Sequence, residues 1–263
     1  MTTLQQAIEQ AKATGNKAFI PYMMAGDGGL ETIKPTILTL QQLGVTAIEV
    51  GIPFTDPVAD GPTIERAGER ALAAGVTLRK VLQTLASFRE EITVPLVVMT
   101  YFNPVLAYGL ETFAKACVAA GVKGLIVPDV PLEESALLRE TLNPHHIDVI
   151  QLVSLTSPPD RIARIAAASQ GFVYAVTVNG ITGARSHFAN NLEHHFACLR
   201  QASPIPVLAG FGISTPEHVK KMGALGDGVI VGSAIVTALH EGDITTVEAL
   251  IAASKGILAK STL

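Results

Sequence analysis

Residues 206–234 read PVLAGFGISTPEHVKKMGALGDGVIVGSA and hold a complete strand–helix–strand unit. The two ends, PVLAGFG and GVIVGSA, are short apolar runs of the kind that form strands covered on both faces. The stretch between them, PEHVKKMGALG, has the spacing of an amphipathic helix. Because parallel strands joined by a helix are the repeating unit of α/β proteins, this stretch predicts the fold class.

The same unit recurs along the chain of 263 residues, which contains eight short runs rich in Val, Ile and Leu. Helical spacing lies between most of the runs, and no linker or change of composition divides the chain. Eight units favour a closed barrel over an open sheet, and no GxGxxG turn follows the first run. We therefore predict one domain over residues 1–263, a (β/α)8 TIM barrel with an extra N-terminal helix. The predicted strands are 18–25, 46–52, 95–101, 124–130, 148–155, 172–178, 206–212 and 228–234.

The overall composition excludes several classes of function. The formal net charge is -4, and no long cluster of Lys and Arg occurs, so neither nucleic acid nor a membrane surface is an expected partner. No apolar stretch is long enough for a membrane span or a signal peptide. Cys117 and Cys198 lie in apolar or amphipathic surroundings, which favours free thiols in a reducing compartment. We expect a cytoplasmic protein.

Two glycine-rich turns near the carboxy terminus suggest an anion site. Residues 210–214 (GFGIS) and 231–236 (VGSAIV) follow the last two predicted strands, and 179–185 (NGITGAR) follows the strand before them. These glycines could serve only turns and packing. However, barrels often bind phosphate between the loops after strands seven and eight, where glycine admits a close ligand and a helix N-terminus offers free N–H groups. We therefore favour a phosphate site.

Glu49 stands inside the predicted strand 46–52. Strand alternation places Ile48 and Val50 on one face and Glu49 on the other, so its carboxyl group points into the barrel. The plain alternative is a structural glutamate paired with a buried base, but none of the eight runs contains Lys or Arg. A buried, unpaired carboxyl group has a raised pKa and can transfer a proton near neutral pH.

The aspartates cannot be ranked from spacing alone. Asp60 could cap the helix that follows it, Asp56 could form an Asx turn before Pro57, and Asp27 and Asp129 could cap turns after strands. His145 with His146 and His194 with His195 form adjacent pairs, and no HxxxH or CxxC spacing indicates a metal site. No GxSxG motif or strand-end lysine points to acyl transfer or a Schiff base.

Several stretches together resemble the tryptophan synthase alpha subunit family over nearly the whole chain. The most specific is IEVGIPFTDPVADGPTI; the others are FIPYMMAGD, AGVT, NPVLAYG, LIVPDVPLEES, GFVYAVTVNGITGAR, VLAGFGIS and GVIVGSAIV. The resemblance implies a TIM barrel that cleaves indole-3-glycerol phosphate to indole and glyceraldehyde 3-phosphate. It implies that Glu49 transfers protons and that Asp60 stays ionised and interacts with the indole N–H group.

The resemblance also implies binding residues and a partner. Around the substrate it places Tyr22, Thr100, Phe102, Val127, Asp129, Val153, Tyr174, Thr182, Gly183, Phe211, Gly212, Ile213, Gly232 and Ser233. Pro53 and Asp56 would face a beta subunit that carries pyridoxal phosphate, in an alpha2-beta2 tetramer, while this chain needs no cofactor or metal. The chain departs from the family pattern at Met24, Gly28, Phe102 and Asn179.

Two other functions remain open from the residues. The chain could be another phosphate-binding barrel enzyme acting on a related indole or sugar phosphate, or a non-catalytic subunit that regulates its partner. The paired Glu49 and Asp60 argue against both alternatives.

Overall fold

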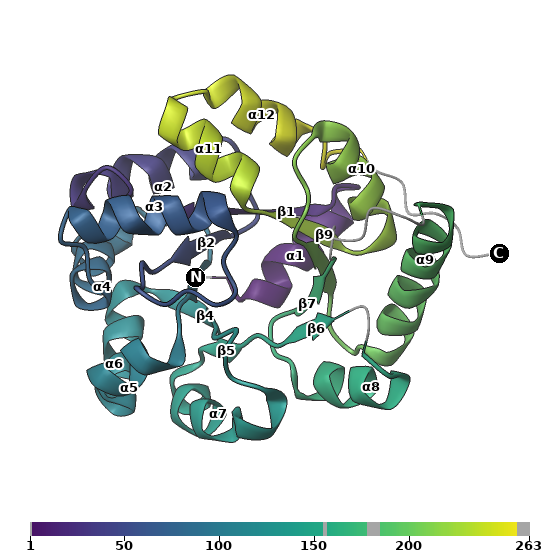
Figure 1. The fold of residues 1–263 in the computed structure, drawn as a ribbon, viewed down its shortest axis with the longest axis horizontal. Coiled ribbons are helices and arrows are strands. Elements are labelled where there is room, and N and C mark those ends of the chain that lie inside the picture. The colour runs from purple at the N-terminus through teal and green to yellow at the C-terminus, as the bar shows by residue number, and fades with distance from the viewer. Residues whose placement is uncertain (1, 155–156, 178–184, 257–263) are drawn as a thin grey trace.

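The computed structural model describes residues 2–154, 157–177 and 185–256. In this part of the chain a parallel sheet curls around a central axis, and the helices cover its outer face (Figure 1). The order of the strands in the sheet is β5-β4-β3-β2-β1-β9-β8-β7-β6. The strands are β1 (Ala18–Met24), β2 (Ile48–Gly51), β3 (Leu96–Met99), β4 (Val122–Ile126), β5 (Asp148–Val149), β6 (Leu152–Ser154), β7 (Val173–Val176), β8 (Val207–Gly210) and β9 (Gly228–Val231).

The fifth predicted strand, 148–155, is divided into β5 and β6 in the structure. Its first part pairs with β4 and its second part pairs with β7. At the junction the Ile150 N–H group donates to Leu125 on one side, and the Gln151 carbonyl accepts from Tyr174 on the other. Strands of a closed barrel are staggered along the axis, so one strand can meet its two neighbours at different heights. The sheet therefore closes through this strand.

The predicted absence of basic residues from the strands is wrong at one position. β4 begins at Val122, earlier than predicted, and includes Lys123. Lys123 lies at the amino end of its strand, where its charge acts on Asp148. This end of the barrel is opposite the one where catalytic groups of such barrels gather.

The helices surround the barrel and bury their apolar faces against the strands, in one contiguous core. None of the helices in the described ranges is long and apolar enough to cross a membrane. The connections between strands and helices in the described part of the chain also contain 3-10 turns. These are η1 (Leu30–Thr32), η2 (Arg89–Glu91), η3 (Leu132–Glu134) and η4 (Asn143–His145). The α-helices are α1 (Leu4–Ala13), α2 (Ile33–Gln42), α3 (Pro62–Ala73), α4 (Leu78–Ser87), α5 (Phe102–Tyr108), α6 (Leu110–Ala120), α7 (Ala136–Leu142), α8 (Pro159–Ala168), α9 (Arg185–Ala202), α10 (Pro216–Leu225), α11 (Ser233–Glu241) and α12 (Ile244–Ala252).

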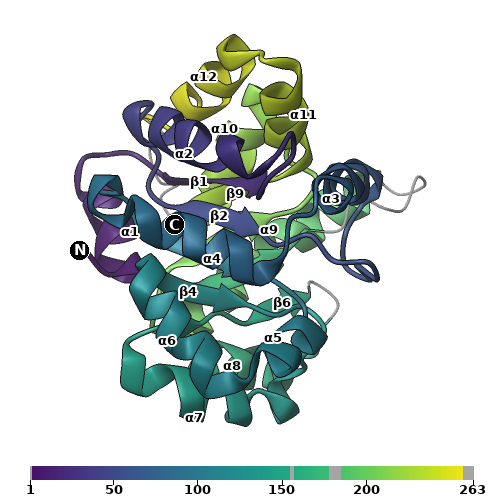
Figure 2. The ribbon, with the colours of Figure 1, turned by 90° about the vertical axis from the view of Figure 1, so that its left-hand side faces the viewer.

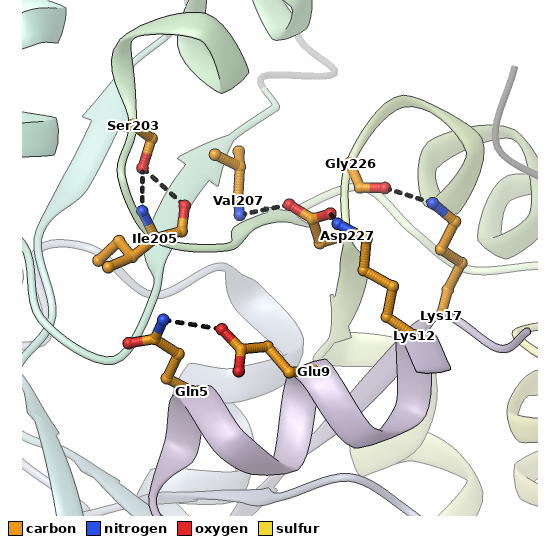
Figure 3. Close-up of polar contacts among 9 residues, drawn as sticks. All are labelled: Gln5, Glu9, Lys12, Lys17, Ser203, Ile205, Val207, Gly226 and Asp227. Carbon is orange, nitrogen blue, oxygen red and sulfur yellow. Dashed lines mark hydrogen bonds and ion pairs between the residues drawn. The ribbon is translucent and has the colours of Figure 1, made fainter. Parts of the chain in front are cut away.

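The extra N-terminal helix, α1, closes the amino end of the barrel (Figure 2). Its apolar residues Leu4 and Ile8 are buried against the barrel. Figure 3 shows how α1 and the residues after it are fastened: Lys12 Nζ lies 3.1 Å from Asp227 Oδ1, and Lys17 Nζ donates to the Gly226 carbonyl at 2.9 Å. With this end closed, the opposite end of the barrel is left to form a site.

Candidate active site

A cavity of about 350 Å³ lies at the carboxyl ends of the strands. This is the end of a (β/α)8 barrel where active sites form, because the loops after the strands surround it. Of the predicted site residues, it is lined by Tyr22, Glu49, Asp60, Tyr174, Phe211, Gly212, Ile213, Gly232 and Ser233. The lining also includes residues that the sequence analysis missed: Ala59, Gly61, Ile64, Met99 and Ser214.

Glu49 lies in β2 with its side chain directed into this cavity, as strand alternation predicts. It is 1% exposed, and its Oε1 atom has no hydrogen-bond partner among the described residues. Burial, with a smaller contribution from the negative charge of Asp60, raises the pKa of Glu49 from 4.5 to about 8. The carboxyl group is therefore protonated at neutral pH, yet close to the pH at which it would release its proton.

Asp60 lies at the end of the loop between β2 and α3. Gly61, and not Asp60, is the N-cap of α3, so capping does not account for this carboxylate. The Tyr101 hydroxyl donates a hydrogen bond to Asp60 Oδ1 at 2.8 Å and accepts one from the Ala59 N–H group at 3.1 Å. Burial raises the pKa of Asp60, and the hydrogen bond from Tyr101 opposes this rise. The loop thus presents a half-buried carboxylate with a fixed orientation.

Tyr101 is a further residue that the sequence did not indicate. The resemblance directs attention to Phe102, but Phe102 begins α5, and its backbone N–H group donates to Asp129 Oδ1 at 3.1 Å. Neither Phe102 nor Asp129 lines the cavity. The resemblance places the buried Thr100 at the substrate. Side chains alternate along a strand, so the next residue, Tyr101, would then be expected to point away from the substrate. The hydrogen bonds of Tyr101 with Asp60 and Ala59 reveal its place.

Three further residues that the resemblance places around the substrate are not among the residues that line the cavity. Thr100 and Val153 are fully buried, and Val127 is 6% exposed. Thr182 and Gly183 fall outside the described residues, as does the unusual Asn179. Their predicted contacts with substrate therefore stay predictions.

Two tyrosines cross the ends of neighbouring strands and depend on glycines there. A Cβ atom added to Gly51 would lie 1.9 Å from the Tyr22 hydroxyl oxygen, and one added to Gly210 would lie 2.2 Å from Tyr174 Cε1. Burial holds the pKa of both phenols well above its ordinary value, so both stay neutral. The rings form two apolar walls beside Glu49.

The turns after β8 and β9 also line the cavity. Phe211 and Gly212 both have a φ of 70°, and the Thr177 hydroxyl lies 2.7 Å from the Gly210 carbonyl and 2.5 Å from that of Phe211. The helix α11 starts at Ser233, at the end of the second turn. Since the first N–H groups of a helix have no intrahelical acceptor, this part of the cavity suits an anion.

The residues predicted to face a partner lie on the same loop as Asp60. Asp56 is exposed and its Oδ2 atom accepts a hydrogen bond from the Thr55 hydroxyl at 2.6 Å. Val58, on the same loop, is 82% exposed, whereas Pro53 is buried. Among the described residues, His, Cys, Asp and Glu side chains form no group of three or more that could hold a metal ion.

Comparisons with known proteins agree with this geometry. A family model described as tryptophan synthase alpha chain matches residues 8–261. The chain is 50% identical to a tryptophan synthase alpha chain of Bacillus thuringiensis subsp. konkukian over 235 residues, which cover 89% of this chain and 91% of that relative. It is 49% identical to one of Bacillus cereus over 250 residues, 95% of this chain and 97% of the relative.

Solved structures give the same result and confirm the predicted barrel. Mycobacterium tuberculosis tryptophan synthase in space group F222 matches with a TM-score of 0.87 and 36% identity, over 97% of this chain and 99% of that one. The alpha subunit from Legionella pneumophila str. Paris matches with a TM-score of 0.86 and 32% identity, over 96% of this chain and 98% of that one. The family model spans nearly all of the sequence, and the chain therefore belongs to the tryptophan synthase alpha chain family.

Proposed function

We propose that this chain cleaves indole-3-glycerol phosphate to indole and glyceraldehyde 3-phosphate by a retro-aldol reaction. Membership of the family makes the chain a lyase of tryptophan biosynthesis. The observation that carries the assignment of residues is the buried, unpaired Glu49, whose pKa is raised to about 8 in the same cavity as Asp60. A group that is protonated at neutral pH and near its pKa can act as both acid and base.

Glu49 is proposed to move two protons in turn. Its protonated carboxyl group gives a proton to carbon 3 of the indole ring, and the ring nitrogen then carries the positive charge. The Glu49 carboxylate next removes the proton from the hydroxyl group on the adjoining glycerol carbon. As that carbon becomes an aldehyde, its bond to the ring breaks, and the electron pair returns to the ring to restore indole. Glu49 is protonated again at the end.

Asp60 is proposed to stabilise the ring during this sequence. An ionised carboxylate beside the indole N–H group accepts its hydrogen bond and offsets the positive charge of the protonated ring. The hydrogen bond from Tyr101 favours the charged form of Asp60 and fixes its orientation. Tyr101 is thus proposed to position the carboxylate and to keep it ionised.

The phosphate group is proposed to bind at the backbone of the turns after β8 and β9. Gly212, Ile213, Gly232 and Ser233 line the cavity there, at the start of α11. Phe211 and Tyr174, whose ring centroids are 5.8 Å apart, would cover the glycerol chain and the indole. Met99 and Ile64 add apolar surface for the ring.

The name of the family, an alpha chain, implies a beta-subunit partner. We further propose an alpha2-beta2 tetramer in which the beta subunit holds pyridoxal phosphate and receives indole, while this chain uses no cofactor. Asp56 and the exposed Val58 support contact of the β2 loop with that partner. A cytoplasmic location is also a proposal, which the free thiols of Cys117 and Cys198 support.

The single-domain prediction for residues 1–263 remains a proposal as well. The contiguous core of the described residues supports it. One cooperative transition in urea, with the same midpoint by circular dichroism and by tyrosine fluorescence, is the expected result. Separate transitions would show two units.

The direct test is an assay of glyceraldehyde 3-phosphate release by the purified chain, with and without a cognate beta subunit. We expect cleavage by the native chain, and loss of cleavage in Glu49→Gln and Asp60→Asn. Glu90→Gln, which changes a carboxylate that is 95% exposed, is the matched control and should keep full activity. Absence of product under both conditions would refute the enzyme assignment and leave a regulatory role.

A further inference from the structure

Asp27, in the turn after β1, lies where the far ends of two helices meet. Its carboxylate accepts two hydrogen bonds from Arg70, at 2.7 Å from Nε and 2.6 Å from Nη2. His240 Nδ1 lies 3.7 Å from Asp27 Oδ1. Arg70 stands in the last turn of α3, and His240 stands in the last turn of α11.

The near ends of the same two helices form two different parts of the cavity. α3 begins at Pro62, directly after Asp60 and Gly61, and α11 begins at Ser233 on the phosphate side. The two helices are in contact with each other and lie side by side (Figure 1). At a rise of about 1.5 Å per residue, the ends at Asp27 are roughly 12 Å from the ends at the cavity.

The turn that carries Asp27 has little freedom to move. Gly26 has a φ of 75°, and a Cβ atom there would lie 2.5 Å from Val76 Cγ2, just beyond α3. The Thr32 hydroxyl lies 3.3 Å from the Asp27 carbonyl oxygen. The Asp27 side chain is only 12% exposed, so its ion pair with Arg70 is partly shielded from water. A bidentate Arg–carboxylate pair fixes angles as well as distance.

The charges at this point also fit the two helices. The last carbonyl groups of a helix carry a partial negative charge, so an isolated carboxylate beside two helix carboxyl ends would be unfavourable. Arg70 offsets the charge of the Asp27 carboxylate, and the His240 ring lies beside the same carboxylate. Asp27 therefore pairs with Arg70 of α3 and lies against His240 of α11, so its side chain contacts the ends of both helices.

We propose that Asp27 and Arg70 are positioning residues, whose ion pair sets how α3 and α11 lie relative to each other. This sets the separation between Asp60 at the start of α3 and the phosphate turn at the start of α11. The inference rests on the proposed function, because a single substrate molecule must reach both places at once. A ligand that spans two subsites depends on their separation, whereas a ligand that fills only one of them does not.

The test compares a linked ligand with its two fragments. The probes are indole, glycerol 3-phosphate, and an unreactive analogue in which a saturated chain joins indole to phosphate. In Arg70→Met and Asp27→Asn we expect each fragment to bind within about twofold of the native chain. The linked analogue should bind about tenfold more weakly, and kcat/KM should fall about ten- to a hundredfold, since small misplacements have effects of this size.

Two further variants keep the test decisive. Arg161→Met removes another bidentate pair with a carboxylate, that of Glu133, which does not line the cavity, and it should leave both ligands unaffected. Arg70→Lys keeps the positive charge but cannot donate the two parallel hydrogen bonds of the guanidinium group to Asp27. The same binding measurements are made on this variant if Arg70→Met fails to fold.

The two proposals fail in distinguishable ways. If the native chain cleaves no substrate, the proposed function fails. If the native chain is active but the Arg70 variants bind the linked analogue as it does, the positioning role fails. Equal weakening of the fragments and of the linked analogue would also overturn it, because that pattern indicates general damage to the site.

Discussion

Replacing Glu49 by glutamine should stabilise the protein at high pH while abolishing its activity. Glutamine has nearly the same shape as the protonated carboxyl group that the cavity holds, but it never ionises. The pKa of Glu49 is raised in the folded state, so the unfolded chain releases this proton at a lower pH than the native chain does. Native stability must therefore fall as the pH rises from the unfolded pKa toward the folded one.

The size of the effect follows from the two pKa values. The difference between 4.5 and about 8 corresponds to a loss of roughly 5 kcal/mol, complete above the folded pKa and absent below about pH 4. Neutral pH lies well above the unfolded pKa and somewhat below the folded one, so the loss of native stability there is about 3 kcal/mol. Glu49→Gln escapes this loss, so its free energy of unfolding should exceed that of the native chain by these amounts.

Urea unfolding followed by circular dichroism, at pH values from about 4 to 9, measures the difference directly. Groups common to both proteins cancel in the subtraction, and the exposed Glu90→Gln should show no such gain. Glycerol 3-phosphate should bind the Glu49 variant as it binds the native chain, since the phosphate turns are unchanged. If the two stability curves run parallel across this range, Glu49 titrates normally in the folded protein, and the acid–base assignment loses its basis.

Two other substitutions test the walls of the cavity. Tyr101→Phe removes the hydrogen bond that lowers the pKa of Asp60; this pKa should rise, and the acidic limb of the kcat/KM profile should move to higher pH with it. Activity requires ionised Asp60 and is lost below its pKa, so an acidic limb that stays in place would contradict the role, and Tyr108→Phe is the unaffected control. Gly51→Ala places a methyl group 1.9 Å from the Tyr22 hydroxyl oxygen, so urea unfolding should show a loss of about 1–3 kcal/mol and kinetics a higher KM. Unchanged values of both would show that the Tyr22 ring has room to move.

Most of the fold could be predicted from the sequence, because apolar periodicity reports burial directly. The eight runs all appear as strands of the barrel, and only the fifth, 148–155, is divided. That division comes from the stagger between neighbouring strands, which no single strand's sequence contains. The start of β4 at Val122 was also missed, because Lys123 interrupts the apolar run at a strand end where its side chain is partly exposed.

A site residue could be predicted where the pattern of a single strand sets its position. It could not be predicted where its position depends on contacts between several elements. Alternation within β2 alone places Glu49 inside the barrel. The choice between Asp56 and Asp60 depends on how a loop folds back, and the contact of Asp60 with Tyr101 joins residues 41 positions apart. Spacing cannot indicate such a pair. Asp27 is a similar case, since its partner Arg70 lies 43 positions away.

The divided fifth strand also sets how the barrel wall can deform. In β5 and β6 each half of the strand has a ladder on one side only, whereas β2 and β3 are paired on both sides. Local opening is easiest where the fewest hydrogen bonds must break, so we expect the sheet to open locally at this strand before it opens at β2 or β3. Val153 lies in β6, the second half of this strand, and is fully buried. The wall can thus yield on that side, by a small separation of β4 from β6, while the β1–β2–β3 ladder that carries Glu49 stays intact.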